Sequence, residues 1–155
     1  IMKLLEEKLP VESLTVMVQK EAAVRICAAP GTRACGAVSV AVQYYSQPQI
    51  LFDVPRDCFF PAPNVDSAVI RLNIRKEPPV KLETEEKQFF KLVKAAFGQR
   101  RKTVLNSLNT GLGKSKEELS AALQQAGIAP TARAEQLTME QFGTLCNLLF
   151  PNKTK

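Results

Sequence analysis

The stretch 50–75, ILFDVPRDCFFPAPNVDSAVIRLNIR, decides the fold. Its two ends, residues 50–54 and 68–75, alternate apolar and polar side chains, which is the period of a β-strand with one buried face. The connector at 56–67 is long and rich in proline, so it cannot form a tight hairpin turn. The stretch therefore predicts two paired strands joined by an exposed loop of fixed shape, and loops of this kind often carry function.

The residues before this stretch predict the rest of an α/β layer. Residues 14–18 (LTVMV) are apolar and rich in β-branched side chains, which favours a strand buried on both faces of a parallel sheet. Helices are expected at 1–7, 20–27 and 36–45, the last of them ended by Pro48. The chain begins with Ile1, inside a predicted helix and without a cap, so we expect it to be a fragment of a longer protein.

The residues after this stretch predict a separate helical part. Two adjacent prolines in KEPPVKL, at 76–82, permit neither a helix nor an interior strand, so this segment is expected to be a linker. Start and stop signals then predict four helices: from a Thr84 cap to about 97, from about 99 to 111, between a Ser115 cap and Gly127, and from a Thr138 cap to about 149.

The charge balance favours an anionic partner. Lys and Arg outnumber Asp and Glu by 21 to 15, which gives a formal net charge of +6. Such a balance suits nucleic acid. The longest apolar stretches are interrupted by Arg25, Ser39 or Gln43 well short of a bilayer's thickness, so no membrane partner is expected.

The cysteine pattern and the absence of histidine limit the kinds of site and reaction that the chain can support. The four cysteines form no C-x-x-C pair and the chain has no histidine, so no metal site is expected. Scattered thiols suggest a reduced, cytoplasmic protein in which cysteines serve as small apolar core residues. Without histidine, hydrolysis by a catalytic triad is disfavoured, because the usual general base is missing.

The segment TGLGKS, at 110–115, has the composition of a phosphate-binding loop but not its spacing. Such a loop needs a glycine five residues before Gly113, where this chain has Leu108, and it must follow a strand rather than a helix. A turn between two helices is the favoured interpretation.

Six basic residues and no acidic residue lie between positions 87 and 102. The first three recur at helical spacing and fall opposite the apolar residues of the same helix, so one face packs and the other is positive. A merely solvated helix face usually carries interspersed Asp or Glu, so contact with RNA phosphates is favoured over that alternative. The predicted RNA-binding residues are Lys87, Lys91, Lys94, Arg100, Arg101 and Lys102.

The loop CFFPAPNVDS presents two aromatic rings beside two prolines. Pro61 and Pro63 stiffen the backbone immediately after Phe59 and Phe60. A rigid aromatic ring can stack on a base that an enzyme has extracted from its helix. The alternative is that both rings belong to the core. The sequence chemistry alone leaves stacking and core packing evenly balanced for one ring and expects the other to pack inward.

Several segments together resemble successive motifs of the ribosomal RNA adenine dimethyltransferases, and the helical part is similar to the branch that acts on small-subunit RNA. The matching segments are QKE at 19–21, PGT at 30–32, SVAVQYY at 39–45, FFPAPNVDSAVIRL at 59–72, FGQRRKTVLNSL at 97–108 and GIAPTARAEQLTMEQFGTLCNLL at 127–149. The resemblance implies the C-terminal portion of a Rossmann-like class I methyltransferase sheet, at 1–75, followed after the linker by a small all-α RNA-binding domain at 83–155.

The resemblance also implies the chemistry. S-adenosylmethionine is the expected cofactor, and the expected substrate is a pair of adjacent adenosines near the 3′ end of small-subunit rRNA, each methylated twice at N6 during assembly of the small ribosomal subunit. In the matched motif Phe59 would stack on the target adenine, and Pro61, Pro63 and Val65 would shape its loop. The basic stretch from Arg100 to Lys102 would contact the rRNA.

The resemblance stops where the cofactor would bind. Members of the family carry a glycine-rich cofactor loop, an acidic residue for the ribose and an Asn-Leu-Pro-Tyr motif, and none of these is in this sequence. We therefore expect no cofactor-binding residue here and no activity from this piece alone. Two rivals remain: a non-catalytic RNA-binding assembly or transcription factor of the same fold, and a plain helical interaction domain without RNA affinity.

Overall fold

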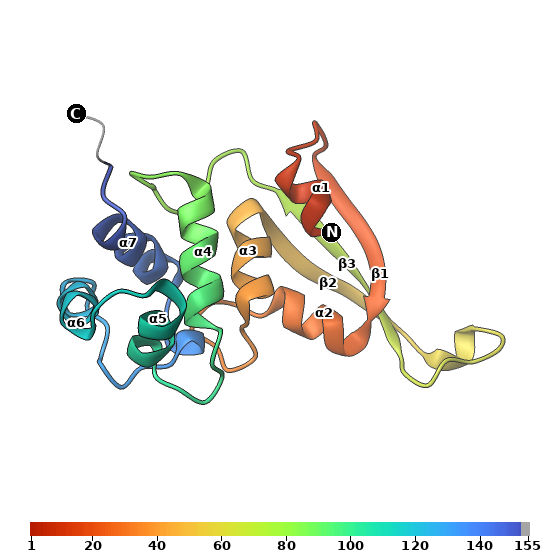
Figure 1. The fold of residues 1–155 in the computed structure, drawn as a ribbon. Coiled ribbons are helices and arrows are strands. Elements are labelled where there is room, and N and C mark those ends of the chain that lie inside the picture. Colours follow the sequence, from red (N-terminus) through yellow and green to blue (C-terminus); the bar gives the residue numbers. More distant parts are fainter. Residues whose placement is uncertain (153–155) are drawn as a thin grey trace.

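The computed structural model describes residues 1–152, so the last three residues of the predicted helical domain lie outside it. Three strands and seven helices, with two short 3₁₀ turns, make up the described chain (Figure 1). In chain order they are α1 (Met2–Glu6), β1 (Ser13–Gln19), α2 (Lys20–Cys27), α3 (Ala37–Tyr45), β2 (Ser46–Val54), η1 (Arg56–Cys58), β3 (Ser67–Ile74), α4 (Glu86–Ala96), α5 (Val104–Leu112), α6 (Lys116–Gln125), η2 (Ala134–Gln136) and α7 (Met139–Leu149).

The sheet has the strand order β1-β3-β2, and both pairings are antiparallel. The predicted pairing of the two strands around the loop is confirmed, with Val54 opposite Ser67 at the loop end. Among the described strands β1 pairs with β3 alone, and antiparallel, so the parallel neighbour that its apolar run predicts is not among them. Pro48 does not end a helix either: it lies inside β2, an edge strand of the described sheet, where a residue without an N–H is tolerated.

Helices cover one face of the sheet. Leu5, Ala23 and Val42, from α1, α2 and α3, pack with Ile70 and Leu72 of β3 in a compact apolar cluster. Along β1 the side chains alternate between half-buried and exposed positions, and Met17 is 51% exposed. The prediction that this strand is buried on both faces is therefore wrong for the described residues, which cover only one face.

The helices after residue 83 form a second core that also includes part of α3. Phe89 and Leu92 of α4, Leu108 of α5 and Phe142 of α7 are fully buried in it, and Tyr44 of α3 packs against them. Figure 1 shows α3 standing between the sheet and α4. The connector at 76–82 contains no helix or strand. Within the described residues, no helix has the length and apolar character needed to cross a membrane.

The helix signals are confirmed for α6 and α7 and are partly wrong for α4 and α5. Ser115 caps α6 and Thr138 caps α7, each by accepting a hydrogen bond from the backbone N–H three residues later. Helix α4 starts after Glu85, and Thr84 does not cap it. Helix α5 starts at Val104 rather than near Gln99, because the Thr103 side chain supplies its cap and the preceding residues form a turn.

Candidate nucleic-acid interface

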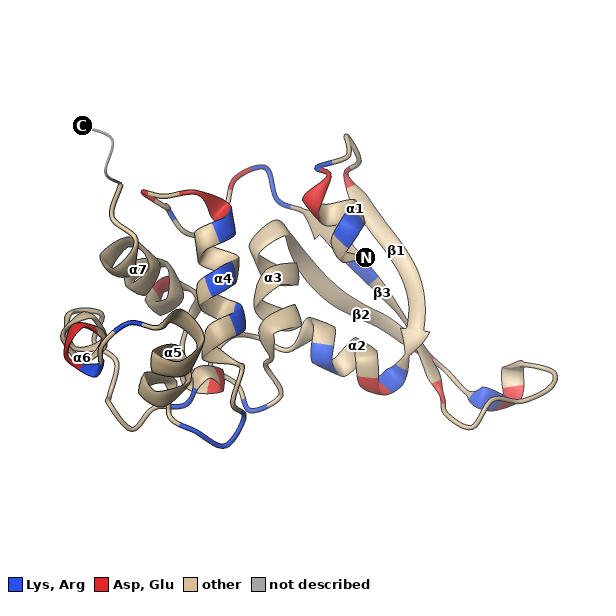
Figure 2. Cartoon of the chain, viewed as in Figure 1, with Lys and Arg blue, Asp and Glu red and all other residues tan. Residues whose placement is uncertain are grey.

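A basic cleft of about 550 Å³ lies between two parts of the chain. One part is α2 with the start of α3, and the other is the end of α4 with the loops at 99–102 and 133–135. The cleft takes basic residues from three loop segments and from α2, and Glu135 is the one acidic side chain that lines it. Its basic residues are Arg25, Arg33, Arg100, Arg101, Lys102 and Arg133. Figure 2 shows the blue loop below α4 that carries three of them. Several cations in one concave surface favour a polyanion, since they neutralise closely spaced phosphates.

The loop between α4 and α5 is shaped by its own backbone. The carbonyl of Gln99 accepts hydrogen bonds from the Lys102 N–H at 3.1 Å and from the Ser107 hydroxyl at 3.3 Å. The Val104 N–H donates to the Ala132 carbonyl at 2.8 Å, which ties the loop to the segment before η2. The turn therefore holds the consecutive basic side chains on the surface, and all three are exposed.

The opposite wall of the cleft is fixed by hydrogen bonds around the start of α3. The Ser39 hydroxyl donates to the carbonyl of Arg25 and accepts from the Gly36 N–H at 3.0 Å. The Gln43 side chain donates to the Ala28 carbonyl. Next to them Cys35 is buried, and burial raises the pKa of its thiol. The backbone that presents Arg33 is thus pinned to both α2 and α3.

The sequence predicted half of this cleft and missed the other half. Arg100, Arg101 and Lys102 are brought together in it as a group. Arg25 of α2 was missed. Arg33 and Arg133 were also missed, because each is an isolated cation in its own loop and only tertiary packing places it beside the others. Their weak signal is that each follows a turn-forming segment, PGT and APTA.

The three lysines of α4 do not line the basic cleft. Lys87, Lys91 and Lys94 are exposed along one side of the helix, visible as stacked blue bands in Figure 2, while the apolar residues opposite them are buried as predicted. Lys87 forms an ion pair with Glu85 at 3.1 Å. Lys91 and Lys94 line a separate groove between α4 and α5.

The loop between β2 and β3 is anchored at both ends. The Asp66 carboxylate accepts a hydrogen bond from the Arg56 N–H at 2.8 Å, and its backbone carbonyl accepts from the Lys20 N–H at 3.0 Å. The Lys20 ammonium pairs with Asp53 at 3.0 Å, and this contact raises the pKa of Lys20. The loop is therefore exposed but held, as the two prolines predict.

The two phenylalanines of this loop differ in exposure. Phe59 is half-buried, whereas Phe60 is fully exposed at 102% and its bond to Pro61 is cis. Because stacking was assigned to Phe59, Phe60 was expected to pack inward. This prediction is wrong, since the Phe60 ring packs against none of the described residues. Pro61, Pro63 and Val65 are exposed beside it.

The loop and the basic cleft lie at different places in the molecule. Figure 1 shows the loop projecting beyond the sheet, at the end away from α4–α7. No described cavity is lined by residues from both. The structure thus brings Arg100, Arg101 and Lys102 into the basic cleft but places Phe59 elsewhere.

The remaining motifs have structural explanations. The segment 110–115 spans the end of α5 and the turn to α6 at residues 113–115, which agrees with the predicted turn between two helices: Gly113 has a φ of 66°, and Lys114 pairs with Glu118 at 3.0 Å. All four cysteines are free, but only Cys35 and Cys146 are buried; Cys58 is exposed in the loop, contrary to the prediction. Among residues 1–152, no group of three or more His, Cys, Asp or Glu side chains is placed to hold a metal ion.

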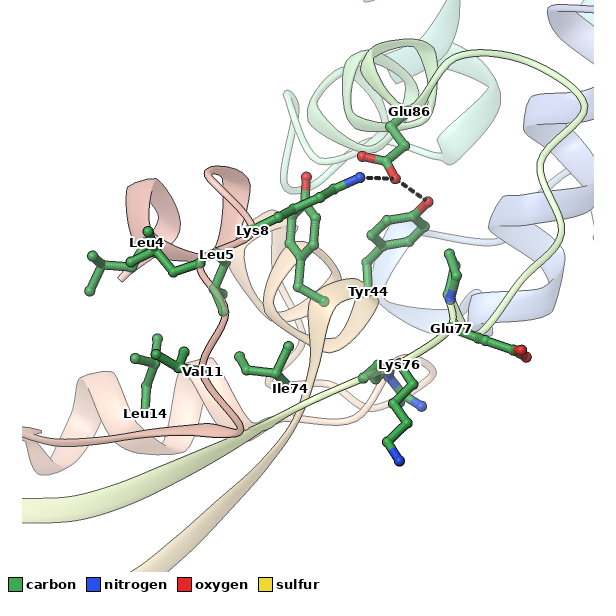
Figure 3. A pocket seen from close by; sticks show the side chains of 14 residues that line it. Leu4, Leu5, Lys8, Val11, Leu14, Tyr44, Ile74, Lys76, Glu77 and Glu86 are labelled. Atoms are coloured by element: carbon green, nitrogen blue, oxygen red, sulfur yellow. Dashed lines mark hydrogen bonds and ion pairs between the residues drawn. The ribbon is translucent and has the colours of Figure 1, made fainter.

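An apolar concavity of about 270 Å³ marks the junction of α1, the sheet and α4 (Figure 3). Leu5, Leu14 and Ile74 line it, and above them the Glu86 carboxylate accepts hydrogen bonds from the Lys8 ammonium and the Tyr44 hydroxyl, both at 3.2 Å. None of the residues predicted for RNA binding or base stacking contributes to it.

Two solved structures share this arrangement over most of the chain. The chain superposes on the crystal structure of a dimethyladenosine transferase from Plasmodium falciparum with a TM-score of 0.72 and 22% identity, covering 93% of this chain and 59% of the other. It superposes on the 23S rRNA methyltransferase ErmE with a TM-score of 0.64 and 26% identity, covering 92% and 57%. The fold is that of the C-terminal part of an α/β methyltransferase.

Sequence comparison identifies the family of the chain. The family model described as ribosomal RNA adenine dimethylase matches residues 1–150, and the chain belongs to this family. It is 51% identical over 154 residues to ribosomal RNA small subunit methyltransferase A of Geobacillus thermodenitrificans and 54% identical over 150 residues to the protein of the same description from Alkaliphilus oremlandii. These matches cover 97% and 96% of this chain but 52% of each relative, so the chain spans about half the length of the relatives it matches.

Proposed function

We propose that this chain is the C-terminal part of an S-adenosylmethionine-dependent rRNA dimethyltransferase that modifies two adjacent adenosines near the 3′ end of small-subunit rRNA. Family membership and the names of the relatives support the reaction class and the substrate. The observation that supports RNA binding is the basic cleft, in which six basic side chains from four segments of the chain line one concave surface. Its partner would be the rRNA of an assembling small ribosomal subunit in the cytoplasm.

In this proposal the two parts of the chain have different tasks. Residues 1–75 would complete the catalytic domain and add Arg25 and Arg33 to the cleft, residues 76–82 would link it to the helical part, and residues 83–155 would supply the other RNA-binding residues. The cleft contacts phosphates, which fixes the position of the RNA without reading its sequence. Phe59 would stack on the extracted adenine, in a loop shaped by its neighbouring prolines and Val65.

The described residues do not fit the cofactor. A nucleoside cofactor in this type of fold is held by a glycine-rich turn between a strand and the following helix. In this chain β1 passes directly into α2 at Lys20, with no glycine between them. We therefore derive no methyl-transfer step from these residues and expect the piece alone to be inactive.

The proposal is tested by measuring RNA binding as a function of salt. The triple variant Arg100→Ala, Arg101→Ala, Lys102→Ala of the 155-residue chain should bind a small-subunit rRNA fragment more weakly. The slope of log affinity against log salt should shrink by about one for each lost phosphate contact. The pair Arg33→Ala, Arg133→Ala should act in the same direction, because both side chains line the same cleft.

Lys116→Ala is the matched control, since this exposed lysine begins α6 and lines none of the described cavities. It should leave the slope unchanged. RNA binding with an unaltered slope in both cleft variants would refute the proposed interface.

A non-catalytic RNA-binding factor of the same fold is the second candidate. Such a factor would use the same basic cleft but would transfer no methyl group. A methyl-transfer assay on the whole protein, using unmethylated small subunits and radiolabelled S-adenosylmethionine, separates the two. Incorporation of label into rRNA supports the enzyme, and none supports the factor.

A further inference from the structure

A second concave surface lies on the other side of α4 from the basic cleft. It is a groove of about 330 Å³ between α4 and α5, lined by Lys91, Lys94, Ala95, Gly98, Gln99, Ser107, Thr110 and Gly111. Lys91, Lys94 and Ala95 of α4 occupy positions i, i+3 and i+4, which form one helical face, and Gly98 follows just after the helix ends. The basic cleft instead takes Ala96 and Phe97, and Gln99 alone lines both surfaces. The end of α4 therefore separates two grooves that meet at one residue.

Small residues form the floor of this groove. At Gly111 an added Cβ would lie 2.7 Å from the Ala95 Cβ, so the two helices approach each other closely there. At Gly98 it would lie 3.2 Å from the Ala95 carbonyl oxygen. Both glycines are exposed. The two glycines thus allow close packing against Ala95, and the floor of the groove consists of backbone and small side chains.

The walls supply positive charge and hydrogen-bond donors. Lys91 and Lys94 form no ion pair with any described residue, whereas Lys87 and Lys114 are paired with Glu85 and Glu118. No acidic side chain lines the groove, and Thr110 and Gln99 add a hydroxyl and an amide. Unpaired ammonium groups beside neutral donors suit phosphate oxygens.

We propose that this groove binds the phosphodiester backbone of a second rRNA segment, distinct from the segment held in the basic cleft. The inference rests on the proposed function and adds a second point of contact to it. Because Gln99 lies between the two grooves, the RNA would straddle the end of α4 with one segment on each side. Two separated contacts would fix the orientation of a folded RNA, which a single basic surface does not do.

The test is the double variant Lys91→Ala, Lys94→Ala in the 155-residue chain. Both side chains are exposed and alanine favours helices, so the fold should persist, which a thermal melt followed by circular dichroism checks. Binding to a small-subunit rRNA fragment should weaken, and the salt slope should fall by about two. Lys116→Ala is again the control.

Hydroxyl-radical footprinting distinguishes the two grooves. We expect the lysine variant to lose protection of one RNA segment and to keep the segment that the Arg100, Arg101 and Lys102 variant loses. An unchanged slope and footprint in the lysine variant, with weakened binding in the cleft variant, would overturn the second site and leave the proposed function standing. Loss of the same segment in both variants would also overturn it. If neither variant weakens binding, the proposed function fails as well.

Discussion

Phe59 and Phe60 are adjacent in sequence but differ in their surroundings, since one ring is half-buried and the other fully exposed. We predict that Phe60→Ala changes the free energy of unfolding by less than about 0.5 kcal/mol, because nothing packs on the ring. Phe59→Ala should cost more, because part of its surface is buried. Denaturant unfolding of the two variants measures both values, and a larger loss at Phe60 would contradict the observed exposure.

The same two residues test base stacking in the whole protein. If Phe59 stacks on the extracted adenine, Phe59→Ala should lose about 1–3 kcal/mol of stacking, which corresponds to a roughly ten- to hundredfold slower methylation. Phe59→Trp should keep much of the activity, because it still offers a flat face. A normal rate in Phe59→Ala, or a rate loss that follows a lower melting temperature, would show that Phe59 is not the stacking ring.

The four thiols should differ in reactivity. Burial raises the pKa of Cys146 to about 11 and also raises the pKa values of Cys35 and Cys27, so little thiolate is present at neutral pH. Cys58 is exposed in the loop. Labelling with a chromogenic disulfide at pH 7.5 should show one fast thiol that disappears in Cys58→Ser, with the buried thiols reacting only after denaturation. Equal rates for all four would contradict this burial.

At the scale of elements, the linker is docked rather than free. The Asn147 side chain of α7 accepts a hydrogen bond from the Glu83 N–H at 2.8 Å and donates one to the Lys81 carbonyl at 3.0 Å. Nearby, a Cβ added at Gly143 would lie 2.9 Å from the Cβ of Val80, so linker and helix are in close contact. Residues 81–83 are therefore held against α7.

Removing this contact should loosen the linker. Asn147→Ala deletes two hydrogen bonds, each worth about 0.5–1.5 kcal/mol, so the free energy of unfolding should fall by about 1–3 kcal/mol. Backbone amides around Glu83 should then exchange faster with deuterium. Thr144→Ala on the exposed side of the same helix is the control. Unchanged exchange at Glu83 in Asn147→Ala would mean that the linker is held by its apolar contacts alone.

Elements defined by local chemistry could be predicted from the sequence, and features defined by tertiary contact could not. The Ser115 and Thr138 caps act within one turn of their own helices, so their motifs predicted α6 and α7 correctly. The start of α5 was misplaced because the Thr103 cap is not marked by a following Glu or Gln. The contribution of Arg133 to the cleft depends on chain segments far apart in sequence, so no local pattern reveals it.

At the scale of the molecule, the Lys8–Glu86–Tyr44 contact joins the sheet part to the helical part (Figure 3). Burial, together with the Glu86 charge, raises the pKa of the neighbouring Tyr45 to about 12. An unfolded tyrosine titrates near 10, so between these values the unfolded chain loses a proton that the folded chain keeps. Stability should therefore fall as the pH rises from about 10 to 12.

Urea midpoints at pH 9, 10 and 11 measure this loss. Tyr45→Phe should reduce the dependence on pH, because its ring cannot ionise, while its stability at pH 9 should change little. A midpoint that falls equally steeply in the variant would assign the alkaline loss to other groups.

The outer edge of β1 has no partner among the described strands, and Met17 is exposed beside it. Unpaired strand edges next to apolar surface promote association. We predict that the 155-residue chain self-associates as its concentration rises, measured by light scattering. Met17→Lys should reduce the effect, and a monomer at millimolar concentration would contradict it.

The position of β3 at the centre of the sheet has a consequence for synthesis on the ribosome. Among the described strands, β1 and β2 emerge first but do not pair with each other, so neither of the two described pairings can form until β3 leaves the exit tunnel. The first pair to close is then Val54 with Ser67, across a loop of about 13 residues, whereas Gln19 must close about 48 residues to reach Ser67. This difference in loop length costs about 1 kcal/mol of additional closure entropy. The nascent chain should therefore form the β2–β3 pairing before the β1–β3 pairing, and the loop that carries Phe59 and Phe60 would take shape before β3 joins β1.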